Sequence, residues 1–93
     1  MPLIEIRAPA GRERVDLVAL GDRVAAAIGA QPEGVWVTWS VVEHSHGVPG
    51  ALAHVYARRS AEQIEALTQV LEEFLGEDVF VTVQPVYALD ADA

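Results

Sequence analysis

The pattern of apolar and polar positions along the chain predicts four β-strands. The first stretch alternates apolar and polar residues, and the other three are rich in valine and aromatic residues. Alternation and β-branched or aromatic enrichment are both typical of strands that are half buried in a sheet. The strands are expected over residues 2–7, 35–42, 52–58 and 79–86.

Two stretches between these strands carry apolar residues at helical spacing. The first runs from about Arg12 to Ile28, and the second follows Ser60. Ser60 and Gln63 have the spacing of a capping box, which favours a helix start at that point. A glycine follows each stretch and is placed to end the helix. The predicted order of elements is therefore β-α-β-β-α-β.

The two halves of the chain resemble each other. Val35-Trp36-Val37-Thr38 is echoed by Val79-Phe80-Val81-Thr82. Each apolar position of the first predicted helix has a counterpart in the second at the same sequence offset, and the same offset separates Arg12 from Arg59. We interpret this pattern as a tandem β-α-β repeat. The single domain then divides into a first unit, 2–42, a second unit, 52–86, and a tail, 87–93.

Two such units side by side predict an α+β fold, in which one four-stranded sheet carries both helices on one face. The same element order also fits a ferredoxin-like fold. The two folds differ in how the first strand pairs: in parallel with the second strand in the tandem arrangement, and in parallel with the third in the ferredoxin-like one. Both arrangements remain open at this point.

The second strand predicts that the chain assembles with copies of itself. Val35, Val37 and Trp39 point to one face, whereas Trp36 and Thr38 point to the other, so neither face is fully polar. Two helices cover only one face. We therefore expect another subunit to cover the second face.

Composition excludes several classes of function. The chain has 93 residues, with 14 acidic against 6 basic, for a net charge of −8, which disfavours nucleic acid and anionic membranes as partners. Cysteine is absent, so disulfides and thiolate chemistry are excluded. All basic residues are arginine, which excludes a lysine Schiff base. Neither a membrane-spanning run nor a signal peptide is visible, so a cytoplasmic protein is expected.

The chain resembles the tautomerase superfamily, which includes 4-oxalocrotonate tautomerase and the macrophage migration inhibitory factor proteins. The resemblance covers roughly Pro2 to Val86. It rests on Met1-Pro2 before an alternating strand, on Gly11-Arg12 before an amphipathic helix, and on the junction from His54 to Glu62.

The resemblance implies an isomerase that needs no cofactor or metal and acts on a small anionic keto or enol acid. Removal of Met1 would expose the secondary amine of Pro2 as the general base. Arg12, and less securely Arg58 and Arg59, would hold the substrate carboxylate. The resemblance also suggests a homotrimer for a chain with two β-α-β units.

One departure from the family concerns substrate binding. Short members carry a second arginine near the position of Trp36, where this chain has an aromatic residue. Trp36 therefore joins the candidate substrate-binding residues, and its presence favours either a more apolar substrate or a different carboxylate-binding arginine. A hydratase or dehalogenase activity in place of isomerisation stays open. So does the alternative of a non-catalytic, ferredoxin-like oligomeric module that binds a small ligand or a protein.

Overall fold

The computed structural model of the chain describes residues 2–43, 45–47 and 50–86. The predicted tail, 87–93, and Met1 lie outside the described residues. The elements in chain order are β1 (Leu3–Pro9), α1 (Leu17–Ile28), a short 3-10 helix η1 (Pro32–Gly34), β2 (Trp36–Val42), β3 (Leu52–Ala57), α2 (Ala61–Leu75) and β4 (Phe80–Pro85).

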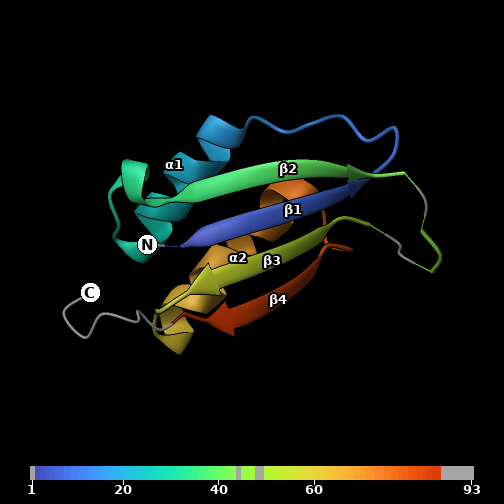
Figure 1. The fold of residues 1–93 in the computed structure, drawn as a ribbon. Coiled ribbons are helices and arrows are strands. Elements are labelled where there is room, and N and C mark those ends of the chain that lie inside the picture. Colours follow the sequence, from blue (N-terminus) through green and yellow to red (C-terminus); the bar gives the residue numbers. More distant parts are fainter. Residues whose placement is uncertain (1, 44, 48–49, 87–93) are drawn as a thin grey trace.

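The four strands form one mixed sheet in the order β2-β1-β3-β4 (Figure 1). β1 is parallel to β2, and β3 is parallel to β4. The two parallel pairs join through β1 and β3, which run antiparallel, with Leu3 opposite Tyr56 and Arg7 opposite Leu52. The predicted tandem β-α-β arrangement is confirmed. The ferredoxin-like alternative is wrong, because it requires β1 and β3 to be parallel.

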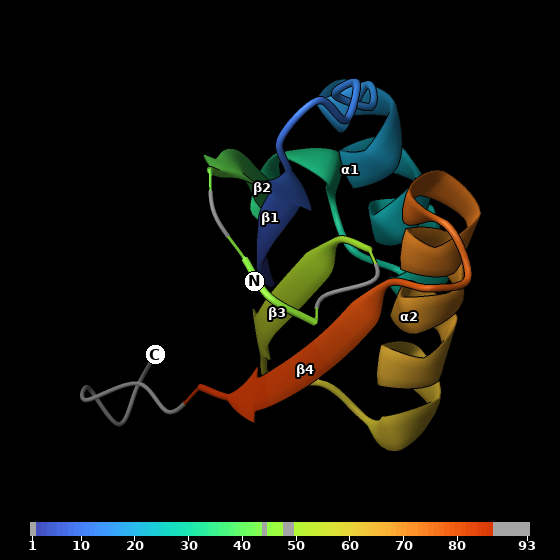
Figure 2. The ribbon, with the colours of Figure 1, turned by 90° about the vertical axis from the view of Figure 1, so that its right-hand side faces the viewer.

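Both helices cover the same face of the sheet, as Figure 2 shows from the side. Alternate residues of β1 and β3 point towards the helices and are buried, while the residues between them point to the opposite face. The largest buried side chains of this core are Ile4, Ile6, Leu20, Val24, Val55, Leu67, Leu71 and Leu75. We call the uncovered side of the sheet the open face. Neither helix of the described chain is long and apolar enough to cross a lipid bilayer.

The two β-α-β units are related by an approximate two-fold axis between β1 and β3. The backbone shows this directly: Trp36 N–H donates to the Pro2 carbonyl at 3.0 Å, and Phe80 N–H donates to the Ala51 carbonyl at 2.9 Å. Ala51 therefore occupies in the second unit the position that Pro2 occupies in the first. Because β1 and β3 are antiparallel, such matched residues lie at opposite ends of the sheet.

The first helix begins later than the sequence pattern predicts. The pattern places its start near Arg12, whereas α1 starts at Leu17. The Asp16 carboxylate accepts a hydrogen bond from Ala19 N–H at 3.0 Å and so caps the helix. The cap, rather than the apolar periodicity, fixes the start of α1.

The second helix begins where the sequence predicts, at a complete capping box. Ser60 Oγ accepts from Gln63 N–H at 3.2 Å, and Gln63 Oε1 accepts from Ser60 N–H at 3.1 Å. The amide nitrogen of Gln63 donates to the Ile28 carbonyl, at the end of α1, at 2.9 Å. The Gln63 side chain thus links the start of one helix to the end of the other.

Replacing Ser60 with alanine should lower the free energy of unfolding by about 1 kcal/mol, because one helical N–H loses its acceptor. For a domain of this size that corresponds to a drop in Tm of about 4–8 °C. Thermal unfolding at fixed protein concentration measures it. Ser60→Asp, which keeps an acceptor, and Ser45→Ala, at an exposed loop serine, should leave Tm nearly unchanged. Equal losses in all three variants would contradict the capping role.

Candidate functional site

Pro2 lies at the end of the sheet where β1 starts and β3 ends. Its side chain is fully buried, and its carbonyl holds the N–H of Trp36. Trp36 pairs with Leu3 on the open face, and Tyr56 of β3 lies directly opposite Leu3. The Trp36 side chain is 53% exposed, so an indole ring stands in solvent one residue away from the buried proline. This group defines what we call the Pro2 end.

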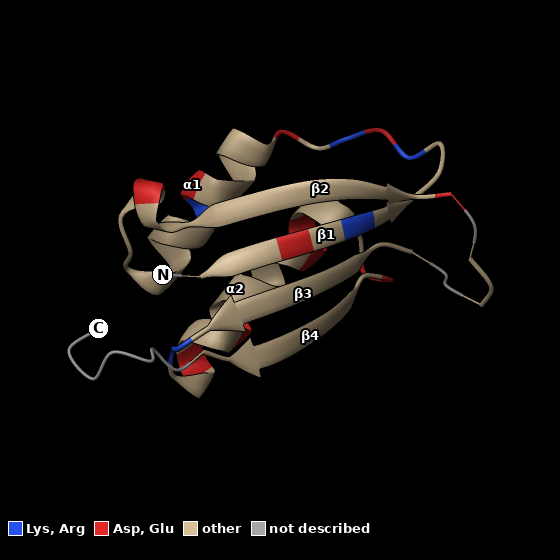
Figure 3. Ribbon diagram, viewed as in Figure 1, with Lys and Arg blue, Asp and Glu red and all other residues tan. Residues whose placement is uncertain are grey.

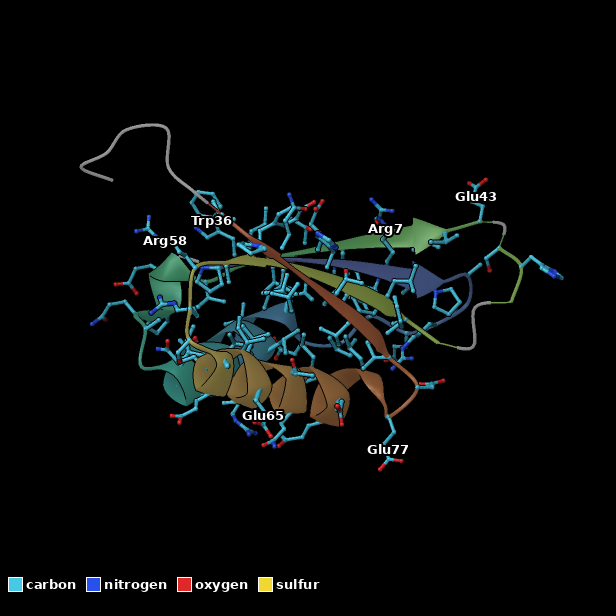
Figure 4. All side chains as sticks on the ribbon, turned by 90° about the horizontal axis from the view of Figure 1, so that it is seen from below. Arg7, Trp36, Glu43, Arg58, Glu65 and Glu77 are labelled. Carbon is cyan, nitrogen blue, oxygen red and sulfur yellow. The ribbon has the colours of Figure 1, made fainter. Side chains whose placement is uncertain are left out.

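Arg58 and Arg59 come directly after β3 and so belong to the Pro2 end. Figure 4 shows Arg58 and Trp36 together at one end of the molecule, with Arg7 and Glu43 at the other. Arg58 is exposed, whereas Arg59 is partly buried. The Nε atom of Arg59 is buried and has no hydrogen-bond partner within the described part of the chain. A buried guanidinium N–H without an acceptor is costly, and an anion would satisfy it.

Arg12 lies at the opposite end of the sheet, beyond the last residue of β1. Its Nη2 donates to the Leu75 carbonyl, in the last turn of α2, at 2.6 Å. The positive charge of Arg12 at this point also interacts favourably with the negative end of the α2 dipole. Within one chain, therefore, the structure brings Pro2, Trp36, Arg58 and Arg59 together and keeps Arg12 apart from them.

The open face carries a polar network across β1, β3 and β4 that the sequence analysis did not single out. The two ring nitrogens of His54 form hydrogen bonds to Thr82 Oγ1 and to Gln84 Oε1, the latter at 3.2 Å. His54 also lies directly opposite Glu5, and its ring meets that of Tyr56 edge-on at 4.5 Å. The sequence shows which residues of each strand share a face, because side chains alternate along a strand. It does not show which strands are neighbours, and that knowledge is needed to place these residues together.

Tyr56 is held by Glu5 within this network. A hydrogen bond from its hydroxyl to the Glu5 carboxylate raises the pKa of Tyr56 above its ordinary value. Desolvation and the negative charge of Glu5 also raise this pKa, while the positive charge of Arg7 opposes them.

Among the strands, only β1 carries charged residues, Glu5 and Arg7, as Figure 3 shows for the open face. A cavity of about 200 Å³ opens beside them. Its lining combines the two charged residues with His54, Thr82 and apolar side chains that include Phe80. The cavity lies away from the Pro2 end, because Arg7 is near the finish of β1 and Phe80 begins β4.

The arrangement at the Pro2 end suits recognition of a small carboxylate. Two arginines share this end of the sheet with an apolar ring and with a proline whose nitrogen would become a secondary amine on loss of Met1. Guanidinium binds carboxylate in a bidentate fork, and the indole offers an apolar surface for the rest of the molecule.

Compared as a sequence, the chain matches no protein-family model and no curated protein. Compared as a structure, it superposes on several solved proteins. A fused 4-OT described as an asymmetric trimer is 17% identical and gives a TM-score of 0.71, with 90% of this chain and 85% of that chain covered. Macrophage migration inhibitory factor from Giardia lamblia is 16% identical and gives a TM-score of 0.65, with 89% of this chain and 97% of that chain covered. The chain has the tautomerase fold.

The tautomerase fold hosts more than one reaction among these neighbours. A malonate semialdehyde decarboxylase, described with decarboxylase and hydratase activities, is 21% identical and gives a TM-score of 0.60, with 98% of this chain and 92% of that chain covered. The resemblance predicted from the sequence is thus confirmed for the fold. The roles of individual residues in this tautomerase fold have to be argued from the site.

Replacing Arg12 with alanine should lower the free energy of unfolding by about 1–3 kcal/mol, because the Leu75 carbonyl loses a charged donor. Arg14→Ala, at an exposed arginine of the same connection, should change it by less than about 0.5 kcal/mol. Chemical denaturation of both variants measures the difference. If Arg12→Ala is as stable as wild type, the contact with α2 does not stabilise the fold.

The Glu5→Gln variant should lower the pKa of Tyr56 towards its ordinary value, because the amide removes the negative charge and accepts a weaker hydrogen bond. Absorbance titration of the phenol follows this change, in a Tyr87→Phe background that leaves Tyr56 as the only tyrosine. Arg7→Gln should shift the same pKa in the opposite direction, upwards. Identical titration curves for the Tyr87→Phe background and for the Glu5→Gln and Arg7→Gln variants made in it would show that the Tyr56 hydroxyl and the Glu5 carboxylate do not interact.

Proposed function

We propose that the chain is a cofactor-independent, tautomerase-like isomerase that moves a proton within an enol or keto carboxylate. The observation that carries the proposal is the Pro2 end, where a buried proline lies beside Arg58 and Arg59, and Arg59 Nε lacks a partner in the described chain. The fold agrees with it, since fused 4-OT and related enzymes are among the structures that it resembles.

Pro2 would act as the general base once Met1 is removed. Burial and nearby guanidinium groups both disfavour the protonated ring nitrogen, so both lower the pKa of this amine. A base whose pKa is near the working pH transfers protons most efficiently. The neutral amine accepts the enol hydroxyl proton, the enolate electrons return to the carbon, and the ammonium delivers a proton to that carbon. Ketonisation then leaves Pro2 neutral again.

Arg58 and Arg59 would hold the carboxylate and stabilise the enolate oxygen as it develops negative charge. Trp36 would pack against the apolar part of the substrate. Arg12 would reach such a site only from a neighbouring copy, because in its own chain it lies at the opposite end of the sheet and contacts Leu75.

We also propose that copies of the chain cover the open face in a homo-oligomer, with a trimer as the expected state. Trp36 is 53% exposed and Phe80 is 61% exposed on that face, which is unusual for large apolar side chains of a monomer. Both an asymmetric and a symmetric fused 4-OT trimer are among the similar structures.

Pro2→Ala should reduce kcat for ketonisation of phenylenolpyruvate and of 2-hydroxymuconate by at least about 100-fold, the usual contribution of a general base. Pro9→Ala, at the proline that ends β1, is the matched control and should keep the activity. Intact-mass measurement of the wild-type protein should show that Met1 is missing.

Two results would contradict this proposal. Equal activity of wild type and Pro2→Ala would remove the proline from the mechanism. A retained Met1 together with no activity would favour the alternative of a non-catalytic module that binds a small ligand or a protein.

A further inference from the structure

Arg58 and Arg59 lie in the short connection between β3 and α2, outside the register of the sheet. β3 ends at Ala57, and α2 begins after Ser60, its N-cap. Strand pairing therefore places the start of this connection but not its end. The position of Arg59 relative to Pro2 consequently depends on what holds the first residues of α2.

A second route joins Pro2 to Arg59 on the helix side of the sheet. The Pro2 carbonyl accepts a hydrogen bond from Trp36 N–H at 3.0 Å, which fixes the start of β2. From there the chain leads back through η1 to the end of α1 at Ile28. The Ile28 carbonyl accepts a hydrogen bond from Gln63 Nε2, in the first turn of α2, at 2.9 Å.

The amide of Gln63 closes this route. Its oxygen accepts from Ser60 N–H at 3.1 Å, and Ser60 follows Arg59 directly in the chain. The route from Pro2 to Arg59 thus consists of short stretches of chain joined by three hydrogen bonds, two of which belong to the same side-chain amide. Loss of the Gln63 amide would break both of those bonds.

The contact between Gln63 and Ile28 is suited to fixing the two helices relative to each other. It is partly buried, and a hydrogen bond is directional, whereas apolar packing between helices is not. A salt bridge between Arg23 and Glu73 also joins α1 to α2 at 2.9 Å, but both side chains are more than half exposed, so water and salt weaken it. Gln63 is therefore the polar contact that holds the start of α2 against the end of α1.

Arg59 is sensitive to its placement. Its Nε atom is buried and has no acceptor among the residues that the structure describes. A guanidinium group binds a carboxylate through two parallel hydrogen bonds, which constrains the position of both partners. A displacement of about 1 Å at a reacting site can reduce the rate about 100-fold. A small movement of the start of α2 would thus weaken the hold of Arg59 on a carboxylate.

We propose that Gln63 is a positioning residue that holds Arg59 where it receives the substrate carboxylate beside Pro2. Gln63 acts through the Ser60 backbone and the end of α1, and it does not touch the substrate. The inference rests on the proposed function, in which Arg59 binds the carboxylate and Pro2 is the base.

Gln63→Leu removes both hydrogen bonds of the amide at similar size and helix propensity. In ketonisation of phenylenolpyruvate it should raise KM at least about tenfold with a smaller effect on kcat, because Arg59 binds the carboxylate both before and during the reaction. The acid-side midpoint of the pH profile of kcat/KM should move to higher pH. A guanidinium group farther from the Pro2 amine lowers the pKa of that amine less.

Two control variants separate positioning from stability. Ser60→Ala weakens the cap of α2 but keeps both hydrogen bonds of the Gln63 amide, since these use the backbone of Ser60 and of Ile28. It should lower Tm, yet retain the KM and the pH midpoint of wild type. Gln69→Leu, the same substitution at an exposed position of α2, should change neither kinetic quantity. A Gln63→Leu protein with the KM and midpoint of Ser60→Ala would refute the positioning role.

Binding of acetate tests the inference without turnover. In NMR titrations, acetate should shift the Nε–H signal of Arg59 in wild type and in Ser60→Ala, and its dissociation constant should be at least about tenfold weaker in Gln63→Leu. If wild type is inactive but shows this difference, the proposed function fails and the positioning role stands. If acetate leaves the Arg59 signal of wild type unchanged, or binds wild type and Gln63→Leu equally, the positioning role is refuted whatever the activity.

Discussion

The antiparallel pairing of β1 with β3 is the constraint on which the rest of the structure depends. Five residue pairs, from Leu3 opposite Tyr56 to Arg7 opposite Leu52, join two β-α-β units that are also linked by the packing of their helices and by side-chain contacts such as Arg12 with the Leu75 carbonyl. This pairing sets the two-fold relation between the units. It also decides which residues share an end of the sheet, because matched residues at the strand ends, such as Pro2 and Ala51, lie at opposite ends of the sheet.

The two matched positions at opposite ends of the sheet carry different residues, Pro2 and Ala51. The backbone at Pro2 and at Ala51 makes equivalent hydrogen bonds to the adjacent strand, so the fold treats the two positions alike. Their side chains differ, since Pro2 carries a pyrrolidine ring and Ala51 a methyl group, and both are buried. The two ends are thus alike in their backbone hydrogen bonds, but they differ in the side chains that they carry.

Much of the fold could be predicted from the sequence, because its signals are local. Alternation, helical spacing and the capping box at Ser60 identified six elements in the correct order, and the tandem β-α-β arrangement is confirmed. The predicted start of α1 was wrong, because the helix-like sequence pattern begins before Asp16, the residue that caps the helix. The choice between the tandem and the ferredoxin-like arrangement needed strand pairing, which is a long-range property that no local pattern contains.

The candidate site was harder to predict from the sequence, because it too depends on long-range strand pairing. Arg12 and Arg59 hold matched positions in the repeat, but they follow the ends of two antiparallel strands, so only Arg59 shares an end of the sheet with Pro2. The network around His54 and Glu5 joins residues of three strands and could not be assembled without their register. The roles predicted for Pro2, Arg58, Arg59 and Trp36 stay predictions until activity is measured.

The amide of Gln63 has a consequence for how the molecule moves. Its oxygen accepts from the Ser60 backbone and its nitrogen donates to the Ile28 carbonyl, so one planar group spans the junction of both helices. Neither a carboxylate nor an ammonium can do both, since the first lacks a donor and the second lacks an acceptor. The junction also lies directly after Arg58 and Arg59 in the chain. Separating the two helices at this junction would break the bond to the Ile28 carbonyl, while the capping box at the start of α2 could stay intact.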